Sequence, residues 1–219
     1  MSDNPLITTT SALAGFLSNL EMLGELRVVA GVSRNLDAAG LTRRICQEPY
    51  GGPALLFREP SPAEGFLITN LLGSLRRQEL GMGLAAGSIA SLEQRFLPLI
   101  TSRGLQLPNE LAPLTAVRPT ALEPRTRFSL FDLPTLVNWP YDGSAAGSGH
   151  YITLGNVHTI DPETSAANCG IYRCQIHGPQ SMAIRWKRGS GAEQHFQRYR
   201  ALQKPMPISI TMGVPPALT

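Results

Sequence analysis

The sequence predicts an α+β protein, in which an N-terminal α/β domain precedes a second half made mainly of β-strands. Three observations predict this class. Apolar residues alternate between helical and strand spacing as far as Gly104. Prolines then recur through residues 107–127 too closely for a long helix or a central strand. Beyond this linker the apolar runs have the length of strands. We therefore expect domains at 1–106 and 128–219.

The N-terminal domain is expected to begin with a helix followed by a strand. Gly24 is placed to end this helix, and the apolar residues on its buried face are Leu13, Phe16, Leu17, Leu20 and Leu23. Residues 25–30 then have the pattern of a short strand. A second helix is expected from Asp37 to a point before Pro49. The apolar runs at 53–57 and 66–70 predict two further strands, the first of them fully buried.

A last helix of this domain is predicted between Ser88 and Gly104. Its apolar residues recur at helical spacing and are Ile89, Leu92, Phe96, Leu99 and Ile100. A single apolar stripe of this kind is typical of a helix that covers a sheet. We therefore prefer that interpretation to a helix that binds a membrane or a partner.

The second half reads as a series of strands with one helix. The expected strands are 134–139, 151–160, 170–177, 181–187 and 206–212, and the expected helix is 194–202. Residues 143–149 consist only of glycine, serine and alanine, so this segment is flexible by composition. It predicts a long hairpin loop, with a mobile lid as the alternative.

Composition argues against several classes of function. The net charge is only +3, from 19 basic and 16 acidic residues that are scattered along the chain, so we expect no nucleic-acid binding. The three cysteines form no disulfide framework, and no apolar run reaches the ~18 residues needed to cross a membrane. The N-terminus also lacks a secretion signal. We expect a cytoplasmic protein with no membrane partner.

Three polar residues in the second half form a candidate site. The amide oxygen of Asn168 and the imidazole of His195 are both suitable ligands for a divalent metal that also holds a phosphate. Arg173 carries a planar guanidinium that can bind a carboxylate through two parallel hydrogen bonds. If 170–177 is one strand, Arg173 shares a face with other polar side chains. The alternative is a structural arginine that pairs with a carboxylate such as Glu163.

Four sequence motifs, in this order, resemble the UbiD-type decarboxylases. They are GGPALLF at 51–57, DPET at 161–164 leading into NCGIYR at 168–173, PMP at 205–207, and GVPPAL at 213–218. The resemblance runs from about residue 17 to 219. It implies an enzyme that uses prenylated flavin mononucleotide (FMN) to add or remove a carboxyl group on an aromatic or α,β-unsaturated acid. It also implies a split β-barrel cofactor domain of the flavin-reductase type, incomplete at its C-terminus.

The resemblance assigns roles to individual residues. The residues matching Asn168 and His195 bind a divalent metal, usually manganese, with potassium nearby, and Arg173 contacts the substrate carboxylate. The cofactor would be contacted by Asn168, Cys169, Gly170, Ile171, Tyr172, Arg173, Arg185, Trp186, Gln194 and His195. A flavin prenyltransferase would supply this cofactor.

The resemblance covers only the N-terminal and cofactor-domain part of such enzymes. In the family, later sequence supplies a metal-binding glutamate, the acidic proton donor and an oligomerisation domain. We therefore expect a hetero-oligomer. In it this chain would be a decarboxylase subunit that is inactive alone, and its partner would resemble the C-terminal half of such an enzyme. Truncation of a longer chain is one alternative. A non-catalytic flavin-binding accessory or regulatory protein is the other.

Overall fold

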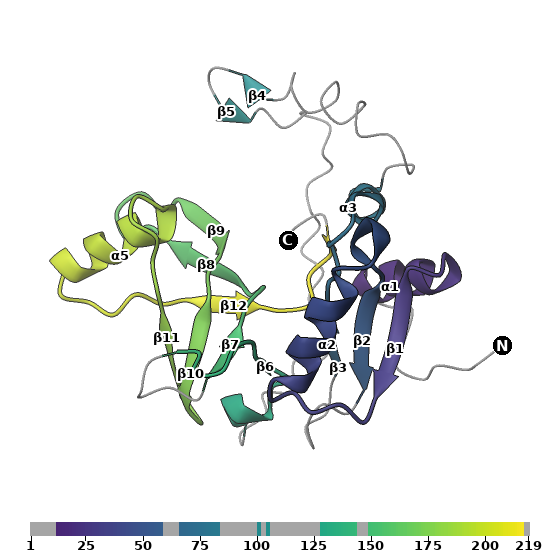
Figure 1. Cartoon of the computed structure of the whole chain (residues 1–219). Helices are drawn as coiled ribbons and strands as arrows, with labels where there is room; N and C mark the ends of the chain where they lie inside the picture. Colours follow the sequence, from purple (N-terminus) through teal and green to yellow (C-terminus); the bar gives the residue numbers. More distant parts are fainter. Residues whose placement is uncertain are drawn as a thin grey trace.

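The computed structural model describes residues 12–58, 66–83, 100–101, 104–105, 128–143 and 149–216. Figure 1 shows two groups of elements, an N-terminal group in purple to blue and a second group in green to yellow. The first group contains α1 (Ala12–Met22), β1 (Leu26–Ala30), α2 (Asp37–Ile45), η1 (Pro49–Gly51), β2 (Ala54–Arg58), β3 (Phe66–Thr69) and α3 (Leu75–Gly81). The second group contains η3 (Leu130–Asp132), β6 (Leu136–Val137), β7 (His150–Ile152), β8 (Asn156–Ile160), β9 (Ala167–Ile171), β10 (Cys174–Gly178), β11 (Ser181–Ile184), α5 (Gly191–Ala201) and β12 (Ser209–Thr211). The predicted α+β class is confirmed.

The N-terminal group is built on a three-stranded sheet with β2 in its centre. Strand β2 runs parallel to β1 and antiparallel to β3. Its first four residues are almost completely buried, as the continuous apolar run predicts. Leu55 and Phe57 pack with residues of α2, whereas Ala54 packs with Phe16 and Leu20 of α1. Side chains alternate along a strand, so the sheet buries both of its faces, one under each helix.

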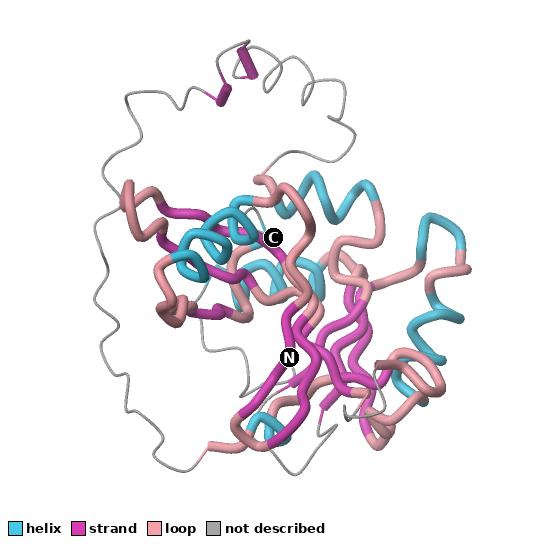
Figure 2. The backbone as a smooth tube through the Cα atoms, turned by 90° about the vertical axis from the view of Figure 1, so that its left-hand side faces the viewer, coloured by secondary structure: helices cyan, strands magenta, loops and turns pink. Residues whose placement is uncertain are grey.

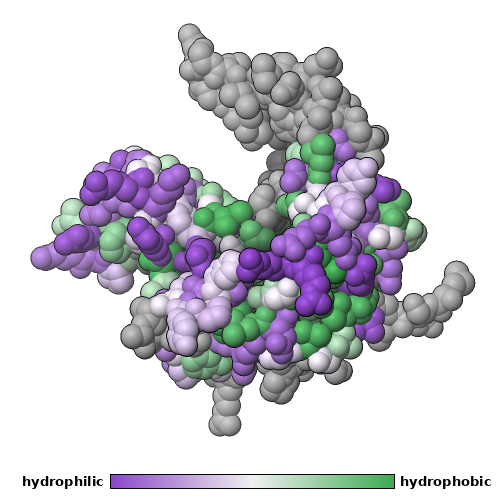
Figure 3. Space-filling view, viewed as in Figure 1, coloured by the Kyte–Doolittle hydropathy of each residue, from purple (hydrophilic) through white to green (hydrophobic). Residues whose placement is uncertain are grey.

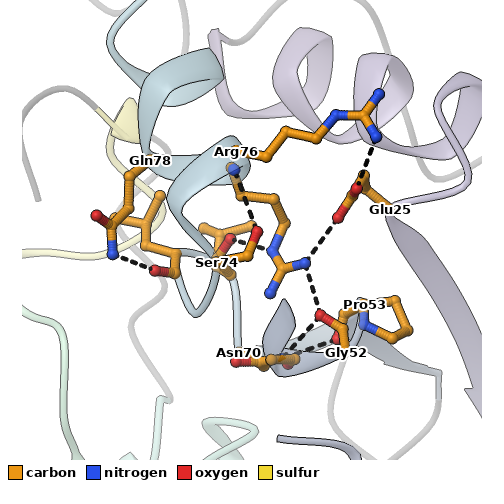
Figure 4. A network of polar contacts seen from close by, with 11 residues as sticks. Glu25, Gly52, Pro53, Asn70, Ser74, Arg76 and Gln78 are labelled. Carbon is orange, nitrogen blue, oxygen red and sulfur yellow. Dashed lines mark hydrogen bonds and ion pairs between the residues drawn. The ribbon is translucent and has the colours of Figure 1, made fainter. Parts of the chain in front are cut away.

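A network of polar contacts ties α3 to this sheet (Figure 4), and a buried arginine takes part in it. The Arg77 side chain is fully buried; its Nη1 lies 2.8 Å from Glu25 Oε2 and donates to the carbonyl of Gly52 at 2.7 Å. Asn70 donates from Nδ2 to the carbonyls of Gly51 and Pro53 at 2.8 and 2.9 Å. The GGP motif therefore has a structural role here, because its carbonyls receive the polar side chains of the next segment.

Helix α3 was not predicted, although its sequence contains a start signal. Ser74 is its N-cap, and its hydroxyl accepts a hydrogen bond from the backbone N–H of Arg77. The helix predicted between Ser88 and Gly104 falls mostly outside the described residues. The last residue of its apolar stripe, Ile100, lies instead in β4 (Ile100–Thr101), which pairs with β5 (Gly104–Leu105). The predicted linker at 107–127 and the centre of the 143–149 loop also lie outside the described residues.

The second group contains two antiparallel sheets and one helix. The strand orders are β11-β10-β7-β6 and β12-β8-β9. Helix α5 lies against β8 and β9, as the views of Figures 1 and 2 agree. A core between the sheets and the helix contains Ile152, Val157, Tyr172, Cys174 and Ala192. The described strands lie in these separate sheets and form no closed barrel. The mixed arrangement of sheets and helices is therefore confirmed, whereas the split barrel is not.

Two predicted strands are each divided into two. The run 151–160 separates into β7 and β8, and the run 170–177 separates into β9 and β10, with each pair split between the two sheets. Gly155 lies at the first corner, where an added Cβ would lie 2.8 Å from Ile210 and 2.9 Å from Ile152. The face-sharing predicted for Arg173 was therefore wrong, because side-chain alternation does not continue through a corner.

Contacts from the segment before β6 join the two groups. Arg34 donates from Nη1 to the Leu133 carbonyl at 2.6 Å and from Nη2 to the Phe131 carbonyl at 3.1 Å. Leu136 is buried in the same apolar cluster as Leu55 and Phe57. The second group is thus anchored on the N-terminal sheet. Within the described residues, no helix is long and apolar enough to cross a membrane.

Candidate functional site

Asn168 and His195 meet around one hydroxyl group. Thr159 of β8 is the register partner of Asn168 on β9, so both side chains lie on the same face of the sheet. Helix α5 packs on that face and brings His195 to it. The Thr159 Oγ1 atom lies 2.9 Å from His195 Nδ1 and accepts a hydrogen bond from Asn168 Nδ2 at 3.4 Å. The two residues proposed as metal ligands therefore share a partner.

The other nitrogen of His195 faces a carboxylate that was not predicted as a site residue. His195 Nε2 lies 3.7 Å from Asp161 Oδ2, and both side chains are buried. Arg198, one helical turn after His195, forms an ion pair with the same Asp161 oxygen. The sequence signal that could have identified Asp161 is the DPET motif, because an aspartate at the start of a turn accepts hydrogen bonds from the backbone that follows.

The start of α5 lies directly beside Asn168. Ser190 caps the helix and accepts a hydrogen bond from the backbone N–H of Glu193 at 3.3 Å. A Cβ atom added to Gly191 would lie 2.3 Å from Asn168 Oδ1, so only glycine allows this approach. The amide oxygen therefore lies at the positive end of the α5 dipole, where backbone N–H groups favour anions.

The donor set fits a divalent cation in chemical type but is incomplete. An amide oxygen and an imidazole nitrogen are ligands for manganese-like ions. Among the described residues, no cluster of three or more His, Cys, Asp or Glu side chains could hold a metal. Asp161 is the nearby acid, and it is engaged on the opposite ring nitrogen. Within the part of the chain that the structure describes, an acidic third ligand to Asn168 and His195 is therefore lacking.

Arg173 lies apart from this pair, at the corner between β9 and β10. Its guanidinium carbon lies 4.4 Å from the centre of the Tyr151 ring, and its Nη2 lies 3.5 Å from Asp142 Oδ2. The side chain is 57% exposed. Arg173 thus pairs with a carboxylate, as the alternative interpretation expected, but the partner is Asp142 and not Glu163, which lies near Arg198. Stacking on Tyr151 holds the guanidinium while leaving donors free.

Arg173 lines a cleft of about 970 Å³ between the two groups of elements. Most of the described lining is apolar, and Figure 3 shows apolar residues exposed where the two groups meet. The larger apolar side chains include Leu36, Leu67, Leu133, Trp139, Leu154 and Met212. A second arginine, Arg43, lies with its guanidinium carbon 5.8 Å from the Trp139 ring centre. The described lining includes no Asp or Glu.

The other predicted cofactor residues divide into exposed and packed side chains. Cys169, Ile171, Arg185 and Gln194 are exposed, and Gln194 Nε2 donates to the Gly189 carbonyl at 3.3 Å. Tyr172 is buried and meets Trp186 edge to face, with ring centres 5.1 Å apart. An added Cβ on Gly170 would lie 2.9 Å from the Tyr172 ring. The packed Tyr172 therefore lies against Gly170 of β9, while the exposed side chains are accessible to a ligand.

Two family models match the sequence. The 3-octaprenyl-4-hydroxybenzoate carboxy-lyase N-terminal domain matches residues 17–94, and the Rift-related domain of the same carboxy-lyase matches residues 115–219. An uncharacterised protein of Aquifex aeolicus is 32% identical over 94% of this chain and 44% of its own length. One from Helicobacter pylori is 28% identical over 90% of this chain and 35% of its own length. The chain thus spans less than half the length of these relatives.

Solved structures share this fold. Vanillic acid decarboxylase of Sedimentibacter hydroxybenzoicus, in its closed form, matches with a TM-score of 0.75 and 24% identity, over 94% of this chain and 43% of that one. The UbiD-class enzyme HmfF from Pelotomaculum thermopropionicum, solved with FMN, matches with a TM-score of 0.67 and 20% identity, over 93% and 42%. At these identities the likeness establishes the fold.

Proposed function

The chain belongs to the UbiD family, and from this premise we propose that it forms the N-terminal and cofactor-binding part of a (de)carboxylase. The cofactor would be prenylated FMN, and the substrate an aromatic or α,β-unsaturated carboxylic acid. A fold neighbour, HmfF, was solved with FMN, and an evolved dimeric form of HmfF was solved with prenylated FMN. The bound flavin would supply the electron sink for loss of carbon dioxide, while the protein positions the reactants.

The observation that carries the proposal is the meeting of Asn168 and His195 at the start of α5. Asn168 Oδ1 and His195 Nδ1 would hold a divalent metal such as manganese, with potassium as a further ion nearby. The first turn of α5 would receive the cofactor phosphate, because its N–H groups and dipole favour an anion. The metal would neutralise the remaining charge of that phosphate. Binding and orientation are thus the contributions of these side chains.

Arg173 is proposed to hold the substrate carboxylate. Its guanidinium lies at the cleft, is half exposed and is stacked on Tyr151, so it can form a two-point contact with an acid that displaces the 3.5 Å contact to Asp142. The apolar walls of the cleft suit an aromatic or unsaturated body. Holding the carboxylate there would fix the geometry of the bond that breaks.

A C-terminal half is proposed to complete the site, either as a partner subunit or as the rest of a longer polypeptide. The described cleft lining has no carboxyl group to return a proton, and among the residues that the structure describes the Asn168–His195 pair has no free acidic ligand. The matched relatives are more than twice as long as this chain. The missing acids would come from that additional sequence.

The test is flavin and metal retention in the complex of this chain with a C-terminal half, produced with a flavin prenyltransferase. Asn168→Ala and His195→Ala should each lose flavin and manganese while the far-ultraviolet circular dichroism is unchanged. His158→Ala is the matched control, because His158 neighbours Thr159 on β8 but bonds to Thr211 at 3.0 Å instead. Retention of flavin and manganese in both site variants would refute the proposed site, and the chain would then be better explained as an accessory protein.

A further inference from the structure

One hydrogen-bond direction in the network around His195 follows from the Asn168 contact if the Thr159 hydroxyl donates to the ring. Asn168 donates from Nδ2 to Thr159 Oγ1, so the hydroxyl uses a lone pair there and has its own proton free to donate to His195 Nδ1. A neutral imidazole carries a proton on one nitrogen only. If Nδ1 accepts from Thr159, the ring proton is on Nε2. The polar side chains on the strand side therefore accommodate a ring protonated on Nε2.

The opposite side of the ring favours the same tautomer. Asp161 Oδ2 lies 3.7 Å from Nε2, which is within ion-pair range but longer than a hydrogen bond. A carboxylate only accepts hydrogen bonds, so it favours a proton on the nitrogen that faces it. Arg198 pairs with the same carboxylate, and a neighbouring cation favours the charged form of a carboxyl group. The Asp161 contact thus favours Nε2–H, and the Thr159 contact is compatible with it.

From this geometry we infer that Asp161 is a positioning residue, which sets the tautomer of His195 and leaves the Nδ1 electron pair directed at Thr159 and Asn168. Its significance rests on the proposed function, since the same electron pair is the one that a divalent cation would bind. Carboxylates behind metal-bound histidines fix ring orientation in this way, and their loss weakens metal binding about 10- to 100-fold.

The two oxygens of Asp161 have separate tasks, which makes a single substitution informative. Oδ1 accepts hydrogen bonds from the backbone N–H groups of Glu163 and Thr164, at 2.9 and 3.2 Å, whereas Oδ2 faces His195 and Arg198. Asp161→Asn keeps an acceptor oxygen for the turn. It places an NH₂ donor opposite Nε2, which would then accept and move the ring proton to Nδ1.

The experiment measures the His195 tautomer by ¹⁵N NMR of the full chain with labelled histidine, in alkaline buffer. The wild type is expected as Nε2–H and Asp161→Asn as Nδ1–H. Glu163→Gln is the matched control: it removes one negative charge from the same turn, at a 60% exposed side chain, and should leave the tautomer unchanged. An Nε2–H ring in Asp161→Asn would overturn the inference.

A second variant approaches the ring from the other side. Thr159→Val is nearly isosteric and removes the hydroxyl while leaving Asp161 in place, so Nε2–H should persist. A change of tautomer in Thr159→Val would overturn the role of Asp161, even if Asp161→Asn fails to fold.

Manganese affinity, measured by electron paramagnetic resonance on the complex of each variant with the C-terminal half, tests the proposed function separately. Asp161→Asn should bind about 10- to 100-fold more weakly than wild type. A switched tautomer with no manganese binding in any sample would refute the metal site and leave the positioning role standing.

Discussion

Arg76 and Arg77 allow one ion pair to be tested in two environments, because both contact Glu25. Arg76 Nη1 lies 3.1 Å from Glu25 Oε1 and its side chain is 47% exposed. Arg77 Nη1 lies 2.8 Å from Oε2 and its side chain is fully buried. Arg76→Met and Arg77→Met remove the same charge and keep a flexible apolar stem. Their effects on stability should nevertheless differ strongly.

The expected magnitudes follow from the contacts that each guanidinium makes. Arg76→Met loses an exposed pair, which contributes about 0.2–1 kcal/mol. Arg77→Met breaks a buried pair and also leaves the carbonyls of Gly52 and Leu71 without this donor. Removing one partner of a buried pair costs about 3–5 kcal/mol. We therefore expect the free energy of unfolding to fall several times more in Arg77→Met.

Urea unfolding followed by circular dichroism measures both values, with fluorescence of Trp139 and Trp186 as a second probe. The loss in Arg77→Met should appear as a lower midpoint at an unchanged slope. Equal losses in the two variants would refute the reasoning, because they would mean that the shared charge, rather than burial and the carbonyl contacts, determines the contribution.

Three further predictions concern the site and its surroundings. Arg173→Lys should lower turnover of the assembled enzyme and spare flavin binding, because lysine keeps the charge but loses the two-point contact; full activity would contradict a role in holding the substrate. Gly191→Ala should weaken manganese binding by displacing the Asn168 amide, since the new Cβ would lie 2.3 Å from Oδ1; unchanged affinity, read by paramagnetic resonance, would argue against that amide as a ligand. Burial lowers the pKa of His150 below its usual value, an effect that the Thr135 carbonyl opposes and Arg34 reinforces. The unfolded chain therefore binds the proton more readily, and stability should fall as the pH drops below about 6.5. His150→Gln should flatten that dependence in urea titrations, and an equal slope in both proteins would count against it.

Cysteine reactivity separates the two thiols of the NCGIYRC segment. Burial raises the pKa of the Cys174 thiol to about 11, whereas Cys169 is exposed on the β9 edge. The two cysteines are close in the sequence, and the predicted strand 170–177 contains only Cys174. The corner at Tyr172 turns Cys174 into the core between the sheets. This difference arises from the change of sheet and not from local composition.

The elements of the N-terminal group were largely predictable, because helical and strand periodicities are properties of consecutive residues. The apolar run of β2 and the stripe of α1 are examples. Helix α3 was overlooked although Ser74 offered a cap, since its apolar residues are few and its interior buries Arg77. A buried arginine contradicts the usual pattern, and only its partners across the fold explain it.

The sequence by itself determined the residue types of the candidate site and the family to which they point. It could not determine which atoms meet. Thr159 and His195 are 36 residues apart, and their 2.9 Å contact depends on α5 packing across β8 and β9. Asp161 and Arg198 gained their places beside His195 through the same packing. Local patterns report which face of an element is apolar, whereas contacts between distant side chains depend on strand pairing, corners and helix docking, and these exist only in the folded chain.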